Sequence, residues 1–276
     1  MTFSIAARSG DGTEWGVAVA SKFLGVGAFV PAARAGIGAL ATQAHVNTTY
    51  KPRGLHQLRA GHTAQQTLEA LLAADADRDQ RQVGIIDVLG SAATFTGGDC
   101  YDWAGGMAED DVAIQGNVLV GPQVVSAMAA AWHESASDAP LTERLLAVLT
   151  AGDDAGGDKR GRQSAALLVV KEAGGYAGLD DVLADLRVDD HPRPCAELAR
   201  LLELHTLYFG QPAEEDKLPL DDALRVETDD LARRLGHADL DEWVGTENFE
   251  NRVWPDTIDR AVLDILRAQA ARGPNG

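Results

Sequence analysis

Thr2 combines two reactive groups on one residue. Its side chain carries a hydroxyl, and after removal of Met1 the same residue also carries a free α-amine. An α-amine has an ordinary pKa of about 7.7–8.0, so it can accept the proton of the hydroxyl at neutral pH. A terminal threonine can therefore act as nucleophile and base together. This pair predicts acyl transfer from an amide through Thr2.

Two residues at the end of the second expected strand could support this chemistry. The charge of Lys22 would disfavour protonation of the nearby amine and stabilise an alkoxide-like hydroxyl. The alternative is a solvated lysine at a strand end. Ser21 precedes it and is a candidate substrate contact. We expect both residues to lie beside Thr2.

Three further polar residues end or interrupt apolar strands. Asn117 follows Gly116 in an interrupted strand and could donate to an oxyanion, although a glycine–asparagine bulge is the alternative. Thr42 and Gln43 follow a very apolar run. They could bind substrate, or they could satisfy the local backbone at a strand end.

A polar loop leads into a buried apolar strand, and such loops often carry function because a rigid sheet positions them. Asp158 is a candidate catalytic residue that could hold Lys22 or the free amine. Arg160 could receive a substrate carboxylate in a bidentate contact. Alternatively, these two residues form an ion pair that shapes the loop. Gln163 and Ser164 are further candidate substrate contacts.

We predict that Lys22, Asn117 and Asp158 converge on Thr2 within about hydrogen-bond reach. Together with Thr2 they form the candidate catalytic set. The substrate-binding set consists of Ser21, Thr42, Gln43, Arg160, Gln163 and Ser164.

The remaining residues indicate neither a metal nor a cofactor. The histidines show no HxxxH or HExxH spacing, and GxGxxG and GxxxxGK[ST] motifs are absent. The acidic run that starts at Asp75 lacks the glycine and glutamate of a calcium loop, and we interpret it as a solvated helix end. Cys100 and Cys195 form no CxxC, and no histidine partner is indicated for a cysteine nucleophile.

Composition narrows the partners and the compartment. The formal net charge is −18 and the pI is about 4.6, which disfavours nucleic acid or anionic membranes as partners. The chain shows no apolar run of 18 residues and no secretory leader. We expect a cytoplasmic protein with free thiols. The composition does not decide whether the protein forms a homo-oligomer.

Period-two and apolar patterns predict the strands that must position these residues, at 2–7, 15–21, 27–30, 38–42, 83–88, 92–96, 112–120, 164–170 and 183–188. Helical patterns are expected at 54–75 with Thr63 as candidate N-cap, 123–135, 141–151 and 194–208. This grouping favours antiparallel sheets with helices outside, an α+β layered sandwich. Near Gly210 the pattern changes to a linker and short amphipathic helices. We expect a main domain over 1–210 and a small all-helical module over 211–276.

Several of these motifs resemble an uncharacterised bacterial and archaeal family (domain of unknown function 1028) placed in the N-terminal nucleophile (Ntn) hydrolase superfamily. The resemblance covers roughly residues 2–210. It implies a four-layer αββα sandwich with a central Thr2 strand and cleavage of amide bonds through the N-terminal residue. The family pattern has a glycine after the tyrosine, whereas this chain has Lys51 after Tyr50. This difference puts only a loop of the resemblance in question. The motifs are Thr2–Ala6, Gly16–Lys22, Gly38–Gln43, Arg81–Gly84, Gln115–Asn117 and Gly156–Ala166.

The C-terminal segment is similar to a peptidoglycan-binding helical module, through residues 246–252 and 258–266. The leading hypothesis is an Ntn amidohydrolase that acts on a small-molecule or peptide-like amide through Thr2. One alternative is a non-catalytic ligand-binding protein on the same fold. Another is a scaffold whose C-terminal module binds a cell-wall fragment or a partner protein. It ranks last because no signal sequence is evident.

Overall fold

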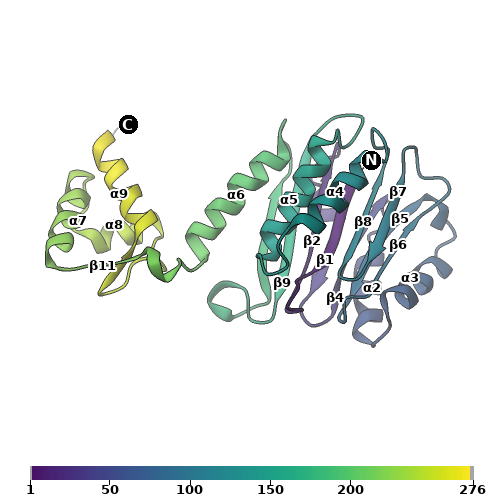
Figure 1. Ribbon diagram of the computed structural model, residues 1–276, viewed down its shortest axis with the longest axis horizontal. Coiled ribbons are helices and arrows are strands. Elements are labelled where there is room, and N and C mark those ends of the chain that lie inside the picture. The colour runs from purple at the N-terminus through teal and green to yellow at the C-terminus, as the bar shows by residue number, and fades with distance from the viewer. Residues whose placement is uncertain (1, 274–276) are drawn as a thin grey trace. The chain divides into compact units, whose positions relative to one another are not determined.

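The computed structural model describes residues 2–273 (Figure 1). They divide into two compact units, one ending at Leu202 and the other beginning at Glu203. The first unit mixes strands and helices, and the second is mainly helical, as the sequence predicts. The domain boundary near residue 210 stays a prediction.

An antiparallel six-stranded sheet holds the N-terminal strand in its interior. The strand order is β10-β9-β2-β1-β8-β7. Thr2 pairs with Asn117 of β8 on one side of β1, and Ser21 of β2 pairs with Ser164 of β9. Because β1 has a neighbour on both edges, the start of the chain is tied into the sheet. The strands are β1 (Thr2–Arg8), β2 (Glu14–Ser21), β7 (Gly105–Glu109), β8 (Val112–Asn117), β9 (Ser164–Lys171) and β10 (Val182–Val188).

A second antiparallel sheet has the order β3-β4-β5-β6. Alternate residues of β4 serve its two faces, as expected for a strand. Ala39 and Ala41 pack toward the six-stranded sheet, whereas Leu40 packs against helices. The strands are β3 (Pro31–Arg34), β4 (Gly38–Ala44), β5 (Arg81–Asp87) and β6 (Ala92–Thr96).

Helices cover the outer faces of both sheets (Figure 1). Helices α4 (Gln123–Glu134) and α5 (Leu141–Asp154) pack on the six-stranded sheet, and α2 (Tyr50–Arg59) and α3 (Ala64–Ala73) pack on the four-stranded sheet. Thr63 caps α3 as predicted, and it forms a capping box with Gln66. Three single-turn 3₁₀ helices lie at Arg78–Gln80, Tyr176–Gly178 and Glu214–Asp216.

Three local predictions are wrong. The apolar run at 27–30 is not a strand but part of helix α1 (Val26–Phe29), which follows the left-handed Gly25 (φ 62°). The helical pattern expected at 54–75 has wrong bounds, because α2 already begins at Tyr50 and a break that includes Gly61 (φ 88°) separates it from α3, which Thr63 caps as predicted. The C-terminal unit is not all-helical, because β11 (Lys217–Pro219) pairs with β12 (Thr257–Asp259).

The C-terminal unit has its own apolar core around the fully buried Trp243. Helices α7 (Asp222–Arg234), α8 (Leu240–Glu247) and α9 (Arg260–Arg272) surround it, together with the end of α6 (Pro194–Phe209). Each of α7, α8 and α9 begins with an aspartate whose side chain accepts a backbone N–H, a strong N-cap.

A buried ion pair joins elements of this unit. Arg252 donates to Asp259 over 2.7 Å and to the carbonyl oxygens of Thr206 and Leu207. The guanidinium thereby links the end of α6 to the start of α9. Within residues 2–273, no helix has both the length and the apolar character needed to cross a membrane.

Candidate active site

Thr2 is the first residue of the interior strand β1 and is buried. Its Oγ1 is 3.1 Å from Oγ of Ser21, at the end of the neighbouring strand β2. Its carbonyl oxygen accepts a hydrogen bond from Nε2 of Gln43 (3.3 Å). The structure therefore brings Ser21, Gln43 and Asn117, three of the predicted site residues, to Thr2.

A buried network of amide side chains surrounds the Thr2 end of both sheets. Oε1 of Gln82 accepts from Nε2 of Gln43 (2.8 Å) and from Nδ2 of Asn117 (2.9 Å). Ser4 donates to Oε1 of Gln43 (2.7 Å) and is 2.6 Å from Nε2 of Gln115, which donates to it. Hydrogen bonds of this kind are strong in a low-dielectric interior, and a satisfied network is rigid. These residues therefore hold Thr2 in a fixed setting.

Gln82 and Gln115 are missing from the predicted site. Both are fully buried, and both lie within motifs that carry the family resemblance, Arg81–Gly84 and Gln115–Asn117. Their position within these motifs is the signal that could have placed both glutamines in the predicted site. A glutamine on an apolar strand gives no indication of which side chain of the opposite sheet it meets.

The Asp158 side chain contacts the main chain at the end of β2, next to Ser21. Its Oδ2 accepts from the backbone N–H of Lys22 (2.8 Å), whereas Nζ of Lys22 donates to the carbonyl of Arg162 (3.3 Å). Asp158 also forms an ion pair with Arg160 (3.2 Å). The loop-shaping ion pair considered from the sequence is therefore present. Asp158 is linked to Thr2 indirectly, through the strand end that carries Ser21.

The other predicted contacts bond to main-chain groups. Ser164 accepts from the backbone N–H of Val26 and donates to the carbonyl of Phe23. The backbone N–H of Gln163 donates to the carbonyl of Ser21 (3.1 Å). Thr42 is buried and its hydroxyl donates to the carbonyl of Asn47 (3.5 Å). These interactions fix the loops around the site.

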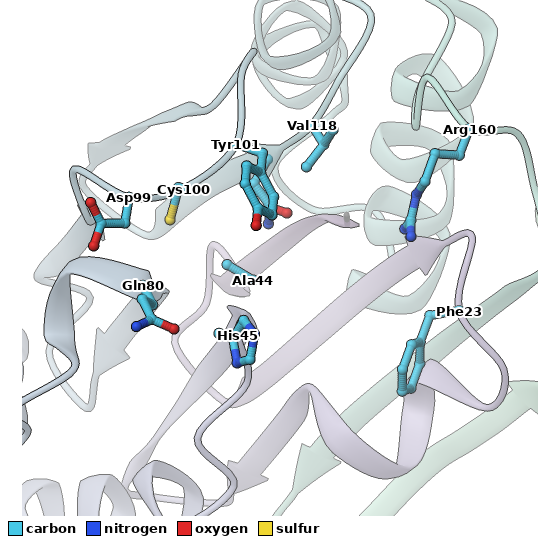
Figure 2. A pocket seen from close by; sticks show the side chains of 10 residues that line it. Phe23, Ala44, His45, Gln80, Asp99, Cys100, Tyr101, Val118 and Arg160 are labelled. Carbon is cyan, nitrogen blue, oxygen red and sulfur yellow. The ribbon is translucent and has the colours of Figure 1, made fainter.

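Two cavities of very different size lie at this end of the sheets. The large cavity, about 860 Å³, is lined by Phe23, Ala44, His45, Gln80, Asp99, Cys100, Tyr101, Asn117, Val118 and Arg160. The small cavity, about 70 Å³, is lined by Thr2, Phe23, Val26, Phe29, Val30, Gln43, Ala44, Val46 and Arg160. Phe23, Ala44 and Arg160 border both cavities, so the two adjoin, and Thr2 lines the small one. In Figure 2, Phe23 and Arg160 flank one side of the large cavity, opposite Gln80, Asp99 and Cys100.

Loop residues that the sequence analysis did not select form much of the large cavity. Both main-chain polar groups of His45 are hydrogen-bonded. Its N–H donates to the carbonyl of Gln80, and its carbonyl accepts from the guanidinium of Arg81 (2.8 Å). No motif marks His45 or Tyr101 in the sequence. Their role in the cavity follows from the loops that join the strands.

Behind His45 lies a buried ion pair between Arg81 and Asp75 (2.9 Å). Asp75 is only 9% exposed, so the interpretation of its run as a solvated helix end is wrong for this residue. Asn47 and the hydroxyl of Tyr50 also donate to its carboxylate. The hydrogen bond from Arg81 holds the pKa of Asp75 well below its usual range. Burial, with the bond to Asp75, raises the pKa of Tyr50.

Two residues on the wall of the large cavity have unusual backbone conformations. Ala44 has a φ of 68° and Val118 a φ of 52°. A positive φ is a genuine outlier for a β-branched residue and costs of order 1–3 kcal/mol. Strained residues of this kind cluster at functional sites, because the surrounding structure must hold them in place.

Metal and cysteine chemistry find little support in the geometry. No group of three or more His, Cys, Asp or Glu side chains in residues 2–273 is arranged to hold a metal ion. Burial raises the pKa of the Cys100 thiol, and its Sγ donates to the carbonyl of Arg81 (3.4 Å). A thiol with a raised pKa is a poor nucleophile at neutral pH.

The chain belongs to a family of unknown function (DUF1028), whose model matches residues 2–198. A second family model, described as "Putative peptidoglycan binding domain", matches residues 208–266. The chain is similar to a protein from Silicibacter pomeroyi whose crystal structure is assigned to the same family. The two share 32% sequence identity and a TM-score of 0.67, over 74% of this chain and 89% of that chain. No curated protein matches the chain.

Proposed function

We propose that the N-terminal unit is an Ntn amidohydrolase that cleaves a small-molecule or peptide-like amide through Thr2. The observation that carries this proposal is the position of Thr2, which lines a small cavity that adjoins a large one and has its Oγ1 3.1 Å from Oγ of Ser21. Two packed sheets with helices on both outer faces and β1 in the interior support an αββα sandwich of the Ntn type.

The proposed reaction needs only groups of this chain and water. After removal of Met1, the α-amine of Thr2 takes the hydroxyl proton while Oγ1 attacks the amide carbonyl carbon. The C–N bond breaks, and the amine leaves with that proton. Water, activated by the same α-amine, then hydrolyses the ester on Oγ1 and releases the acid. The Ser21 hydroxyl orients Oγ1 throughout.

Other residues have supporting roles in this proposal. Asn117 lines the large cavity, and its amide has a second N–H besides the one donated to Gln82, which is available to an oxyanion. The charge of Lys22 at the end of β2 favours the neutral α-amine. Asp158 positions that strand end. Arg160 borders both cavities and is the candidate anchor for a substrate carboxylate.

Substitution of Thr2 tests the mechanism. Thr2→Ala should abolish hydrolysis of any amide found in a substrate screen, while Thr2→Ser keeps measurable activity because hydroxyl and amine both survive. The alanine variant loses one hydrogen bond to Ser21, so its free energy of unfolding should fall by only about 0.5–1.5 kcal/mol. Full activity in folded Thr2→Ala would refute the mechanism.

Intact-mass analysis of protein from native cells is the companion measurement, and it should show Thr2 as the first residue. Quantitative retention of Met1, or no turnover by the processed protein across a broad amide screen, favours the non-catalytic alternative. The large cavity would then bind a ligand without chemistry.

For the C-terminal unit we propose binding of a peptidoglycan fragment. The family match over 208–266 supports it, together with a cavity of about 290 Å³ lined by Leu235, His237, Trp243, Glu247, Gln269, Arg272 and Gly273. Calorimetric titration of the whole chain with soluble muropeptides tests this proposal. Binding should weaken in Arg272→Ala, and an unchanged affinity would exclude this cavity as the binding site.

A further inference from the structure

The two cavities beside Thr2 differ in size and in lining, and this difference bears on the substrate. We infer that the substrate is an amide of a short aliphatic acid, acetyl or propionyl, with a larger and polar amine. The acyl group occupies the small cavity and the amine occupies the large one. This inference rests on the proposed function, because it assumes that Thr2 is acylated.

The small cavity suits a short apolar group. Apart from Thr2, Gln43 and Arg160, its lining consists of aromatic and aliphatic side chains. Its volume of about 70 Å³ is about half that of an engineered apolar cavity of about 150 Å³ that holds the six carbons of benzene. A methyl or ethyl group beyond the carbonyl fits this space, whereas a longer chain would extend beyond it.

The wall of the small cavity is held in place by specific contacts. The rings of Phe23 and Phe29 meet edge to face, with centroids 5.3 Å apart. The backbone of Val26 donates to the Ser164 hydroxyl, and Nζ of Lys51 donates to the carbonyl of Ala28 (2.9 Å). Because helix α1 is anchored at both points, the cavity cannot widen freely for a longer acyl chain.

The large cavity adds polar side chains to a surface that is also partly apolar. It is an order of magnitude larger, and its lining includes an imidazole, a phenol, two side-chain amides and a carboxylate, from His45, Tyr101, Gln80, Asn117 and Asp99. Such a surface offers donors and acceptors in several directions. It suits an amine that carries hydroxyl, amide or charged groups.

The order of events decides which half of the substrate is the acyl half. The bond between Oγ1 of Thr2 and the acyl carbon forms as the C–N bond breaks, and the hydroxyl proton leaves with the amine. The amine must then depart, and a water must reach the ester, while the acyl group stays on Thr2. A large cavity gives the amine a way out and the water a way in. The group that remains bound to Thr2 is therefore the one next to the small cavity, which Thr2 lines.

Activated esters of increasing chain length test this inference. The probes are 4-nitrophenyl acetate, propionate, butyrate and hexanoate, applied to protein whose intact mass begins at Thr2. Nitrophenolate release is measured together with the mass of the N-terminal peptide, and the release by Thr2→Ala is subtracted. An apolar pocket distinguishes one methylene by about 10–200-fold. We expect hexanoyl transfer to Thr2 to be at least about tenfold slower than propionyl transfer.

Variants of the wall make the test specific. Two variants, Phe29→Ala and Val46→Ala, each remove side-chain atoms from the wall of the small cavity. Each should raise the rate of hexanoyl transfer relative to propionyl transfer by about tenfold. Leu24→Ala is the matched control, since Leu24 is an exposed apolar neighbour of Phe23 outside the described linings of both cavities. Its chain-length profile should match that of the unaltered protein.

The outcomes separate this inference from the proposed function. Acylation of Thr2 at equal rates by all four esters, or fastest by hexanoate, overturns the inference and leaves the nucleophile in place. An unchanged chain-length profile in both wall variants overturns the inference in the same way. If no ester acylates Thr2, the proposed function fails and the inference fails with it.

Discussion

The space between the two sheets has an apolar end and a polar end. Along the interior strand β1, the residues that face the other sheet change from Ala6 to Ser4 to Thr2. The same change occurs along β4, from Ala39 and Ala41 to Gln43. Two further strands show the same change, from Ile86 to Gln82 along β5 and from Ala113 to Gln115 and Asn117 along β8.

The contrast shows what each end contributes. Small apolar side chains at one end let the sheets approach closely and supply hydrophobic stabilisation. Buried amides at the other end contribute little net stability, since each must be fully hydrogen-bonded to offset its desolvation. The polar end instead restricts the positions of the groups around Thr2. The apolar end of these strands thus stabilises the fold, whereas the polar end of the same strands positions the groups around Thr2.

The largest effect should come from the ion pair that supports the polar end. Asp75→Asn removes the counterion of the buried Arg81, and breaking such a pair costs about 3–5 kcal/mol. Urea unfolding at pH 7 measures the loss. Because the folded-state pKa of Asp75 is lowered, its contribution to stability is complete above the ordinary pKa of about 3.9 and is lost as the pH falls below it. The variant should therefore show a flatter decline in stability below about pH 4.

Asp77→Asn is the matched control for this experiment. The Asp77 side chain is 66% exposed and contacts Arg81 at 3.4 Å, so its removal should change the free energy of unfolding by no more than about 1 kcal/mol. Equal losses in the two variants would show that the Asp75 pair has no special role.

A cavity at the apolar end should reduce stability without changing chemistry. Ile86→Ala truncates a fully buried side chain between the sheets and should cost about 2–5 kcal/mol in urea unfolding. The rate of Thr2 acylation, measured where the variant is still folded, should stay within about twofold of the original rate, since Ile86 lines neither cavity. A large loss of acylation in folded protein would mean that the two ends are not separable.

A change within the polar end should have the reverse signature. Gln82→Met keeps the side-chain length but removes the oxygen that accepts from Gln43 and Asn117, at a cost of about 1–3 kcal/mol. Acylation of Thr2 should fall by at least about tenfold, because Asn117 is no longer held. If the acylation rate is unchanged in the folded variant, the network does not position the site.

Period-two and apolar patterns predict most of the strands of the N-terminal unit, because β1, β2 and β5 are short runs that are buried on both faces. They fail at α1, where a short apolar run suits a strand and a helix equally well. They also miss β7, an exposed edge strand whose Gly105 and Gly106 give no alternation.

The site was only partly accessible from the sequence. The predicted set included Thr2, Ser21, Gln43 and Asn117, which lie together because β1 is bonded to β2 and β8 and faces β4. The polar partners from β5 depend on how the two sheets stack, and a pattern along one strand does not contain that information. The large cavity depends on loop conformations, including the positive φ of Ala44 and Val118, which no local rule anticipates.

The interior position of β1 also sets a schedule for biosynthesis. Thr2 emerges first from the ribosome, but its partner Asn117 is synthesised much later. At about 5–20 residues per second, the strand waits on the order of ten seconds before β8 can enclose it. During that interval β1 can already pair with β2, but its other edge has no partner yet. Under the proposed mechanism, removal of Met1 before β8 is in place would couple the number of molecules with a free Thr2 amine to the rate of synthesis.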